Sequence, residues 1–398
     1  MDAGVIFDEG LLAEVSSQVI MKIRTITTGF SLDFPVREEQ FRRIALFTNN
    51  CKRAFEDEGY AVQTVRVSTQ PWDEYSESRE QTLDIVDELE SLTHKYDIDY
   101  FSVGTTANPK QIPLAYGIIK NTSNGFCSSL ISDNRQTNYE AARQTATLVK
   151  KTSGISRDGF ANLRFAALFN VKPGTPFFPA AYHEGPTSFA IGLENSDLVY
   201  RAFSKSGNIE RAKSYLKGIL TEEYEKVERI AEQVGRKEEV DYGGIDASIA
   251  TSVNPDESVA YAFEKLGLGR FGEAGTLAVA SLVTETLGEL NIEKCGYSGL
   301  MLPILEDYGL AMRNNEEMFD MGNLLLYSAV CGTGLDTIPL PGDVSEKKLY
   351  SLLLDVASLS NKLDKPLSAR LMPVPGKKSG EMTDYDFEYI VNSRILKL

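Results

Sequence analysis

Residues 23–32, IRTITTGFSL, begin the stretch of sequence that decides the fold, and this stretch continues to residue 69. The first run is rich in β-branched residues. It is followed at residues 38–58 by apolar side chains spaced near the 3.6-residue period of a helix. A second β-rich run, VQTVRVST, occupies residues 62–69. A strand, a helix and another strand in succession indicate an α/β fold.

The same alternation continues along the chain. About ten strands interleaved with helices predict an α/β layer or barrel. We expect one domain over residues 1–398, with an N-terminal extension at residues 1–21 and a long, charged, exposed helix at residues 209–237. The further strands are predicted at residues 98–104, 126–131, 164–171, 188–193, 245–252, 300–305, 337–340 and 368–374. The further helices are predicted at residues 76–95, 138–151, 257–266, 275–287, 315–327 and 345–360.

The composition is globular and acidic, with 42% hydrophobic and 25% charged residues and a formal net charge of −16. Diffuse negative charge argues against nucleic acid or an anionic membrane as the main partner. No apolar run reaches the roughly 18–20 residues that span a bilayer. The acidic N-terminus lacks the cationic region of a signal peptide. The four cysteines are scattered and none forms a CxxC pair, so we expect a reduced, cytoplasmic protein without disulfides.

The segment PGTPFFPAAYHEG, residues 173–185, follows an apolar strand and ends in His183 and Glu184. Its three prolines, two phenylalanines and flanking glycines predict a rigid loop at a strand end, where α/β proteins place ligand chemistry. His183 is a candidate acid, base or ligand, because imidazole titrates near neutral pH. The alternative is a histidine tied by backbone hydrogen bonds in a tight turn. For Glu184 both interpretations stay open.

The segment GYSGLMLPILEDYG, residues 296–309, ends in two adjacent carboxylates, Glu306 and Asp307. Carboxylates at a strand end can orient a substrate or transfer protons. For Asp307 the alternative is a cap for the helix that follows. Asp336 lies in the glycine-rich segment CGTGLDTIPLPG, residues 331–342, which has neither the GK[ST] of a phosphate-binding loop nor the GxGxxG of a dinucleotide site.

Other polar residues extend the candidate site. Cys127, in FCSS, is a candidate nucleophile, although a small buried residue is the alternative. Asp246 and Ser248 are candidate ligand-binding residues. Arg24 and Arg370, on the first and last strands, can hold a carboxylate or phosphate through paired hydrogen bonds, or can pair with Glu306 or Asp307. Zinc-ligand spacing such as HExxH is absent, so no metal site is predicted, and a carboxylate-bound Mg²⁺ or Ca²⁺ stays open as the alternative.

Six segments together resemble domain-of-unknown-function family 711. They are KIRTITTGFSL (residues 22–32), FCSS (126–129), AYHEG (181–185), IDASIATS (245–252), GYSGLMLPILEDYG (296–309) and CGTGLDTIPLPGD (331–343). The resemblance implies a fold similar to pyruvate formate-lyase, a closed barrel of about ten strands with outer helices and a loop that projects inside. It implies no activity. A shared fold does not carry function.

Glycyl-radical chemistry is disfavoured, because the last glycine, Gly380, lies in the charged segment KKSGE. We predict instead an enzyme that acts on a small polar or anionic metabolite in a barrel cavity, with acid/base chemistry by His183, Glu184, Glu306 and Asp307. Lyase or transferase chemistry is one interpretation, and the cofactor is unknown. The alternatives are a non-catalytic ligand-binding or regulatory protein on the same barrel, and a homo-oligomeric scaffold.

Overall fold

The strands form one mixed sheet in a computed structural model that describes residues 21–76 and 78–398. The predicted N-terminal extension therefore lies outside the described residues, apart from Met21. Ten strands are described, in the order β8-β7-β1-β2-β3-β4-β6-β10-β9, with β5 beside β4. Their bounds are β1 Lys22–Gly29, β2 Val65–Ser68, β3 Tyr100–Thr106, β4 Gly125–Asp133, β5 Gln136–Thr137, β6 Phe165–Phe169, β7 Ser188–Glu194, β8 Asp241–Asp246, β9 Gly334–Pro341 and β10 Leu367–Val374.

Apart from β5, which pairs antiparallel with β4, the strands of the sheet fall into three parallel sets. Strands β1, β2, β3, β4 and β6 run parallel to one another, and so do β7 and β8, and β9 and β10. The sets meet at two antiparallel seams, where β1 pairs with β7 and β6 pairs with β10. The hydrogen-bonded order runs from β8 at one edge to β9 at the other, so an α/β fold is confirmed but a closed barrel is not.

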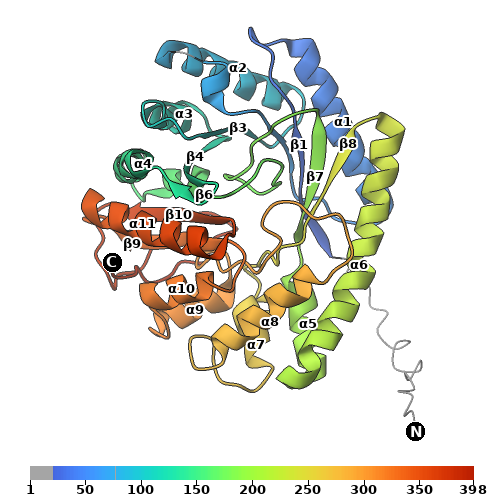
Figure 1. Cartoon of the computed structure of the whole chain (residues 1–398), viewed down its shortest axis with the longest axis vertical. Helices are drawn as coiled ribbons and strands as arrows, with labels where there is room; N and C mark the ends of the chain where they lie inside the picture. Colours follow the sequence, from blue (N-terminus) through green and yellow to red (C-terminus); the bar gives the residue numbers. More distant parts are fainter. Residues whose placement is uncertain (1–20, 77) are drawn as a thin grey trace.

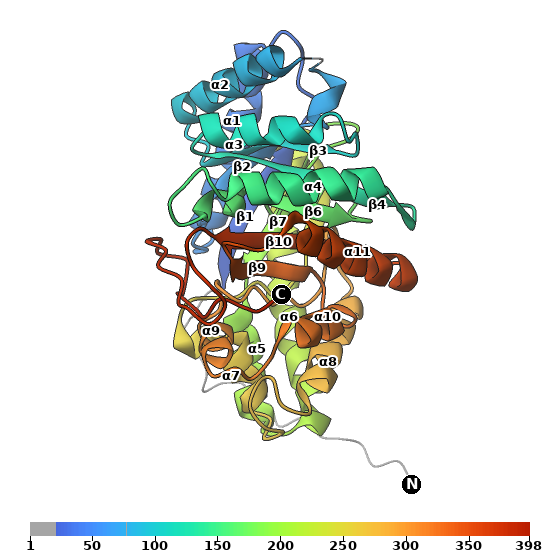
Figure 2. The same ribbon diagram turned by 90° about the vertical axis from the view of Figure 1, so that its left-hand side faces the viewer.

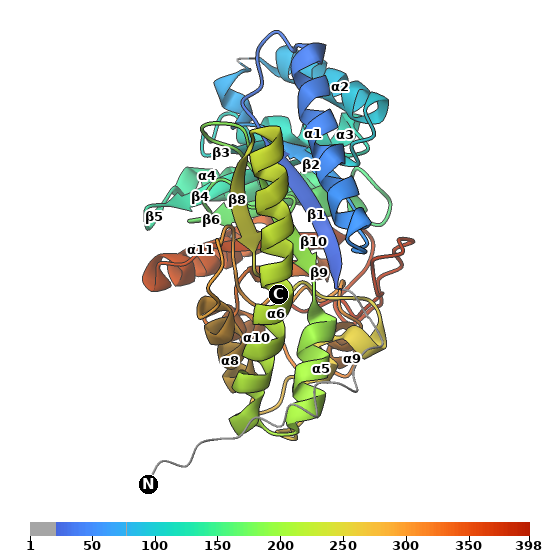
Figure 3. The same cartoon turned by 90° about the vertical axis from the view of Figure 1, so that its right-hand side faces the viewer.

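Helices lie around the outside of the strands, as Figure 1 shows. The longest is α6, which lies against β8 and beside α5 (Figure 3). In Figure 2, α4 and α11 lie side by side over the part of the sheet that contains β6 and β10. The bounds are α1 Glu38–Asp57, α2 Arg79–Lys95, α3 Ala115–Asn121, α4 Tyr139–Thr152, α5 Ser196–Ser206, α6 Ile209–Glu238, α7 Val259–Glu264, α8 Thr276–Gly288, α9 Tyr308–Asn315, α10 Met321–Ser328 and α11 Glu346–Leu363.

Helix α6 has two unlike faces. Side chains such as Leu216, Leu220 and Tyr224 recur at helical spacing and are fully buried. Exposed ion pairs occupy the opposite face, such as Lys226 with Glu222 at 2.9 Å. Only the charged face of this helix is therefore exposed to solvent, as expected for an amphipathic helix.

Two segments differ from the predicted strands. The strand predicted at residues 245–252 ends at Asp246, because this carboxylate accepts hydrogen bonds from the backbone and side chain of Ser248 and turns the chain. The apolar run at residues 300–305 makes only isolated parallel bridges, Ile249 with Leu300 and Pro303 with Asp336. Here Gly299 packs against Gly332 so closely that a Cβ on Gly299 would lie 2.3 Å from the Gly332 Cα.

The two faces of the sheet have different surroundings. Alternate residues of each strand face the helices and form the main hydrophobic core, for example Val65 and Val67 of β2. The residues between them face the other way, toward a small second cluster that includes Ala166, Leu168 and Tyr182. Charged and aromatic side chains on this inner face form the site described below.

Candidate functional site

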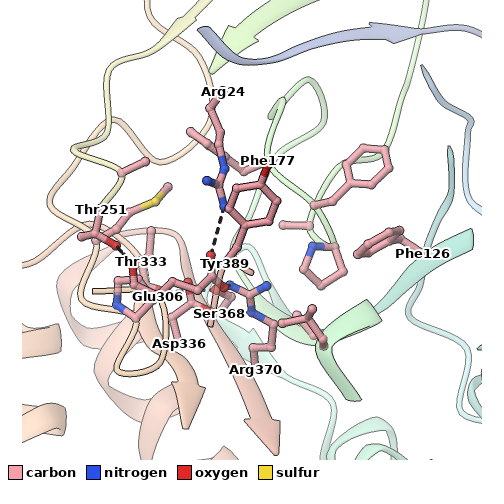
Figure 4. Close-up of a pocket in the computed structure, with 18 of the residues that line it drawn as sticks. Arg24, Phe126, Phe177, Thr251, Glu306, Thr333, Asp336, Ser368, Arg370 and Tyr389 are labelled. Atoms are coloured by element: carbon pink, nitrogen blue, oxygen red, sulfur yellow. Dashed lines mark hydrogen bonds and ion pairs between the residues drawn. The ribbon is translucent and has the colours of Figure 1, made fainter. Parts of the chain in front are cut away.

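A cavity of about 150 Å³ lies on the inner face of the sheet. Strands β1, β2, β9 and β10 contribute charged groups to it, and Figure 4 shows Arg24, Glu306, Asp336 and Arg370 around the same space. The side chains face inward because of strand alternation: Arg370, for example, lies between Ala369 and Leu371, which pack in the main core.

Arg66 is the most unusual group in this cavity. It is only 9% exposed, and its guanidinium lies over the rings of Tyr100 at 5.4 Å and Phe178 at 5.1 Å. Its Nε donates to Thr64 Oγ1 at 2.9 Å. Burial, with a smaller contribution from Arg24, lowers the pKa of Arg66 to about 9, so it remains charged at neutral pH. In the part of the chain that the structure describes, no carboxylate forms an ion pair with Arg66.

The other two arginines hold carboxylates. Glu306 joins them, with its Oε2 3.3 Å from Arg24 Nη2 and its Oε1 2.6 Å from Arg370 Nη2. Arg370 Nε also donates to Asp336 Oδ1 at 2.6 Å. Burial opposes the charge of Arg370, but Asp336 and Glu306 outweigh it and raise the pKa of this guanidinium. Arg24 is also paired with Glu194 at 2.9 Å.

Aromatic side chains form the apolar part of the lining. On one side, Phe126 lies 5.4 Å from Tyr100 and 5.2 Å from Phe178 between ring centroids. On another side the lining comes from the C-terminal segment, where the ring of Tyr389 lies 5.6 Å from the Arg24 guanidinium. The cavity thus combines fixed charges with flat apolar surfaces.

The loop after β6 reaches this inner face as well. The Pro176 carbonyl accepts from Thr27 Oγ1 at 2.8 Å, and the Ala181 carbonyl accepts from Ser102 Oγ at 2.8 Å. These bonds fix the loop against β1 and β3, with Phe177 and Phe178 facing the cavity. The loop after β6 and Glu306 therefore line the same cavity, whereas His183 and Glu184 do not line it.

Asp246, Ser248 and Asp307 are buried and engaged in hydrogen bonds outside the lining. Asp246 accepts from Tyr297 N and Ser298 N, each at 2.9 Å, and from Ser248 Oγ at 2.6 Å. Asp307 caps α9, because its Oδ1 accepts from Leu310 N at 2.9 Å. Its Oδ2 accepts from Val259 N, at the start of α7, at 2.7 Å. Burial raises the pKa of Asp307 to about 6, against the effect of these bonds. The hydrogen bonds of these three residues hold the loops in place. The ligand-binding roles of Asp246 and Ser248 and the catalytic role of Asp307 stay predictions.

Cys127 lies on β4 and faces the main core. It is fully buried, and burial raises the pKa of its thiol to about 12. A thiol in this state supplies almost no thiolate at neutral pH, which disfavours nucleophilic catalysis. All four cysteines are free.

His183 lies beside a separate small cavity of about 30 Å³. Its ring packs on the backbone of β1, since a Cβ on Gly29 would lie 2.5 Å from His183 Nδ1. Its Nε2 lies 2.9 Å from the Gly185 carbonyl oxygen, to which an Nε2–H donates. Burial lowers the pKa of His183, although the Gly185 hydrogen bond opposes this. Its role as acid or base stays a prediction, and Glu184 is an exposed neighbour.

Replacing His183 with glutamine is expected to lower the free energy of unfolding at about pH 7.5 by about 1–3 kcal/mol, because a buried hydrogen bond is lost. In the unfolded chain imidazole titrates near pH 6.5, and the folded pKa is lower. The stability that His183 contributes is thus present above about pH 6.5 and is lost as the pH falls through the folded pKa. Urea unfolding from about pH 7.5 to 5.5 should show a shallower decline for His183→Gln. His94→Gln, at an exposed position, is the control and should leave stability unchanged. If His183→Gln had the same denaturant midpoint and the same pH dependence as the wild type, a structural role for His183 would be contradicted.

Several lining residues are absent from the sequence-based candidates, above all Arg66, Phe177, Thr251 and Tyr389. Arg66 has a signal in the sequence, because it lies between two valines in VRVS and so on the opposite face of β2 from them. That pattern is typical also of a solvent-facing side chain.

Within the described residues, no three His, Cys, Asp or Glu side chains are grouped closely enough to hold a metal ion. None of the described helices has the length and hydrophobicity needed to cross a bilayer.

Fold and cavity define an α/β protein with a buried, arginine-containing pocket. The model of the family described as Uncharacterised ACR (DUF711) matches residues 15–386, so the chain belongs to this family, as its sequence motifs predict. The UPF0210 protein of Pyrobaculum aerophilum is 28% identical over 355 residues, which cover 82% of this chain and 76% of that protein. The UPF0210 protein of Acetivibrio thermocellus is 25% identical over 398 aligned residues, with 92% and 88% covered. That of Pyrobaculum arsenaticum is 33% identical over 264 residues, with 62% and 56% covered.

Proposed function

We propose that the protein is an enzyme that binds a small organic anion in this cavity and acts on it by acid/base chemistry. The observation that carries the proposal is the buried Arg66 guanidinium, which has no carboxylate partner among the described residues. A buried charge without a partner is costly, and a bound anion removes that cost by pairing with it.

Comparison with a half-buried arginine, Arg164, supports this interpretation. Arg164 also lacks a carboxylate partner, but its guanidinium donates to backbone carbonyls, among them Thr122 O at 2.8 Å and Gly125 O at 3.1 Å. Within the described residues Arg66 makes a single hydrogen bond, from Nε to Thr64, so its two terminal nitrogens are available to a ligand. Guanidinium groups suit carboxylates and phosphates because they donate two parallel hydrogen bonds.

Glu306 is the acid/base group that we favour, because it is the carboxylate that both lines the cavity and contacts two arginines. Asp336 accepts a hydrogen bond from Nε of Arg370, beside the Nη2 that contacts Glu306, and so positions this guanidinium. Non-catalytic binding is the second candidate. It is favoured by the fact that both carboxylates facing the cavity are already ion-paired. Incubation of the ligand with the protein, followed by mass spectrometry for a product, separates the two candidates.

We also propose that the chain forms a single barrel domain similar to pyruvate formate-lyase. The isolated bridges of Ile249 with Leu300 and of Pro303 with Asp336 support this, because they link the β8 side of the sheet to β9. Four free cysteines support the cytoplasmic location that we propose. Assembly into a homo-oligomer stays a prediction.

Replacing Arg66 with methionine is expected to weaken anion binding by roughly 10- to 100-fold, the range for losing one or two hydrogen bonds to a charged group. The dialysed variant should be at least as stable as the wild type, because methionine removes an unpaired buried charge and keeps the apolar contacts. Native mass spectrometry of both proteins should show a retained anion only in the wild type.

Arg143→Met is the matched control, since this guanidinium also lies over an aromatic ring, that of Tyr350, but is exposed. It should leave both binding and stability unchanged. Equal anion binding by wild type and Arg66→Met would overturn the proposal.

A further inference from the structure

We propose that the ligand is a monocarboxylate with a flat apolar body about the size of a benzene ring, and that Phe387 and Tyr389 of the C-terminal segment select it. This inference rests on the proposed anion site and names its ligand class. The carboxylate pairs with Arg66, and the body lies between the aromatic surfaces of the cavity.

The balance of charge favours a single negative charge on the ligand. Of the three guanidinium groups that line the cavity, Arg24 is ion-paired with Glu194 and Glu306, and Arg370 with Glu306 and Asp336. Arg66 therefore contributes one positive charge that has no ionic partner among the described residues. A monocarboxylate neutralises it, whereas a phosphate monoester carries about −1.5 to −2 at neutral pH and leaves negative charge buried.

The setting of Arg66 favours a planar acceptor. Its guanidinium carbon lies over the rings of Tyr100 and Phe178, and its Nε is occupied by Thr64. This leaves the edge that carries its terminal nitrogens, which matches the two coplanar oxygens of a carboxylate. A second buried polar group lies in the same lining, because Thr333 Oγ1 has no hydrogen-bond partner within residues 21–76 and 78–398.

The size and walls of the cavity favour a flat apolar body. A cavity of about 150 Å³ in an unrelated protein holds one benzene molecule. In Figure 4, Phe126 lies on one side of the cavity, and Arg24 and Tyr389 lie apart from Phe126, nearer to Glu306. Rings on several sides suit an aryl or short unsaturated group, which gains from both burial and ring contacts.

The C-terminal segment provides the wall that faces solvent. Phe387 and Tyr389 line the cavity, yet they are 36% and 38% exposed. The loop that carries them is fixed at its base, where Asn392 Oδ1 accepts from Thr383 Oγ1 and Tyr385 N, each at 2.8 Å, and where Val391 N donates to Leu305 O at 2.8 Å. Because the base is held, these two rings stay over the cavity and exclude water from the ligand body.

Calorimetric titration with four probes tests this inference: benzoate, acetate, phenyl phosphate and inorganic phosphate. Benzoate is expected to bind at least about tenfold more tightly than each of the others. Arg66→Met should remove most benzoate binding. Phe387→Ser and Tyr389→Ser should weaken benzoate binding several-fold and leave acetate binding unchanged. Met382→Ser is the control, because Met382 is exposed in the same segment and does not line the cavity.

The outcomes separate the two proposals. Phenyl phosphate binding as tightly as benzoate, with both dependent on Arg66, would overturn the ligand class and leave the anion site standing. Benzoate binding no more tightly than acetate, or equally in the two serine variants, would overturn the role of the aromatic walls. Binding that does not depend on Arg66, or no binding of any probe, would overturn the anion site and this inference with it.

Discussion

Arg370→Met is expected to lower the free energy of unfolding by about 3–5 kcal/mol at neutral pH, the cost of removing one partner from a buried ion pair. The side chain of Arg370 is 11% exposed and contacts both Glu306 and Asp336 at 2.6 Å. Methionine fills similar space but removes the positive charge that both carboxylates contact. Glu306 then keeps only its longer contact, with Arg24. Urea unfolding of the two proteins measures the difference.

Neutral partners provide the control for this effect. The triple variant with Arg370→Met, Glu306→Gln and Asp336→Asn removes the carboxylates together with the cation, and should recover much of the loss. Arg370→Lys should lie between wild type and Arg370→Met, because an ammonium cannot reproduce two contacts made by a planar fork. A loss below about 1 kcal/mol for Arg370→Met would show that the network is effectively solvated.

Gly299→Ala is expected to destabilise the protein by about 3 kcal/mol or more, at the upper end of the cost of overpacking. A Cβ at this position would lie 2.3 Å from the Gly332 Cα and 3.0 Å from its backbone nitrogen. Both neighbours are backbone atoms, so the chain must move to make room. The displaced segment also carries Glu306, and we expect anion binding to weaken with it. Urea unfolding and benzoate titration test both effects.

Gly218→Ala is the matched control, since it adds the same methyl group at an open position of α6, where no atom outside the local helix backbone lies within 4 Å. Alanine favours helix over glycine, so this variant should gain up to about 1 kcal/mol. If the two variants had equal stability, the close contact of Gly299 with Gly332 would not exist in solution.

The alternation of strands and helices is readable in the sequence because most strands pack one face on helices, which leaves an apolar pattern. The last strand, β10, begins at Leu367, one residue from its predicted start at residue 368. Residues 300–305 are equally apolar but contain Pro303, which has no amide hydrogen to donate, and they make only isolated bridges. The short helix α3 has no long periodic pattern, and it was not predicted.

The candidate site is readable only in part. Arg24 and Arg370 are recognisable as charged residues within strands, and both meet Glu306. Arg66 has the same signal, but a charge on an alternating strand is equally typical of a surface. What distinguishes Arg66 is its position on the inner face of a large sheet. This face forms only through contacts between segments that are distant in the sequence. The aromatic residues of the C-terminal segment come to the cavity for the same reason.

The antiparallel seam between β6 and β10 has a consequence for biosynthesis. The apolar strand FAALF, residues 165–169, leaves the ribosome early, but its partner residues Leu367 to Ala369 follow near the end of synthesis. At about 5–20 residues per second the free edge of β6 waits roughly 10–40 s. An unpaired apolar edge is a template for wrong pairing with other chains. We therefore expect nascent chains of this protein to depend on chaperones more than the stability of the finished fold would suggest.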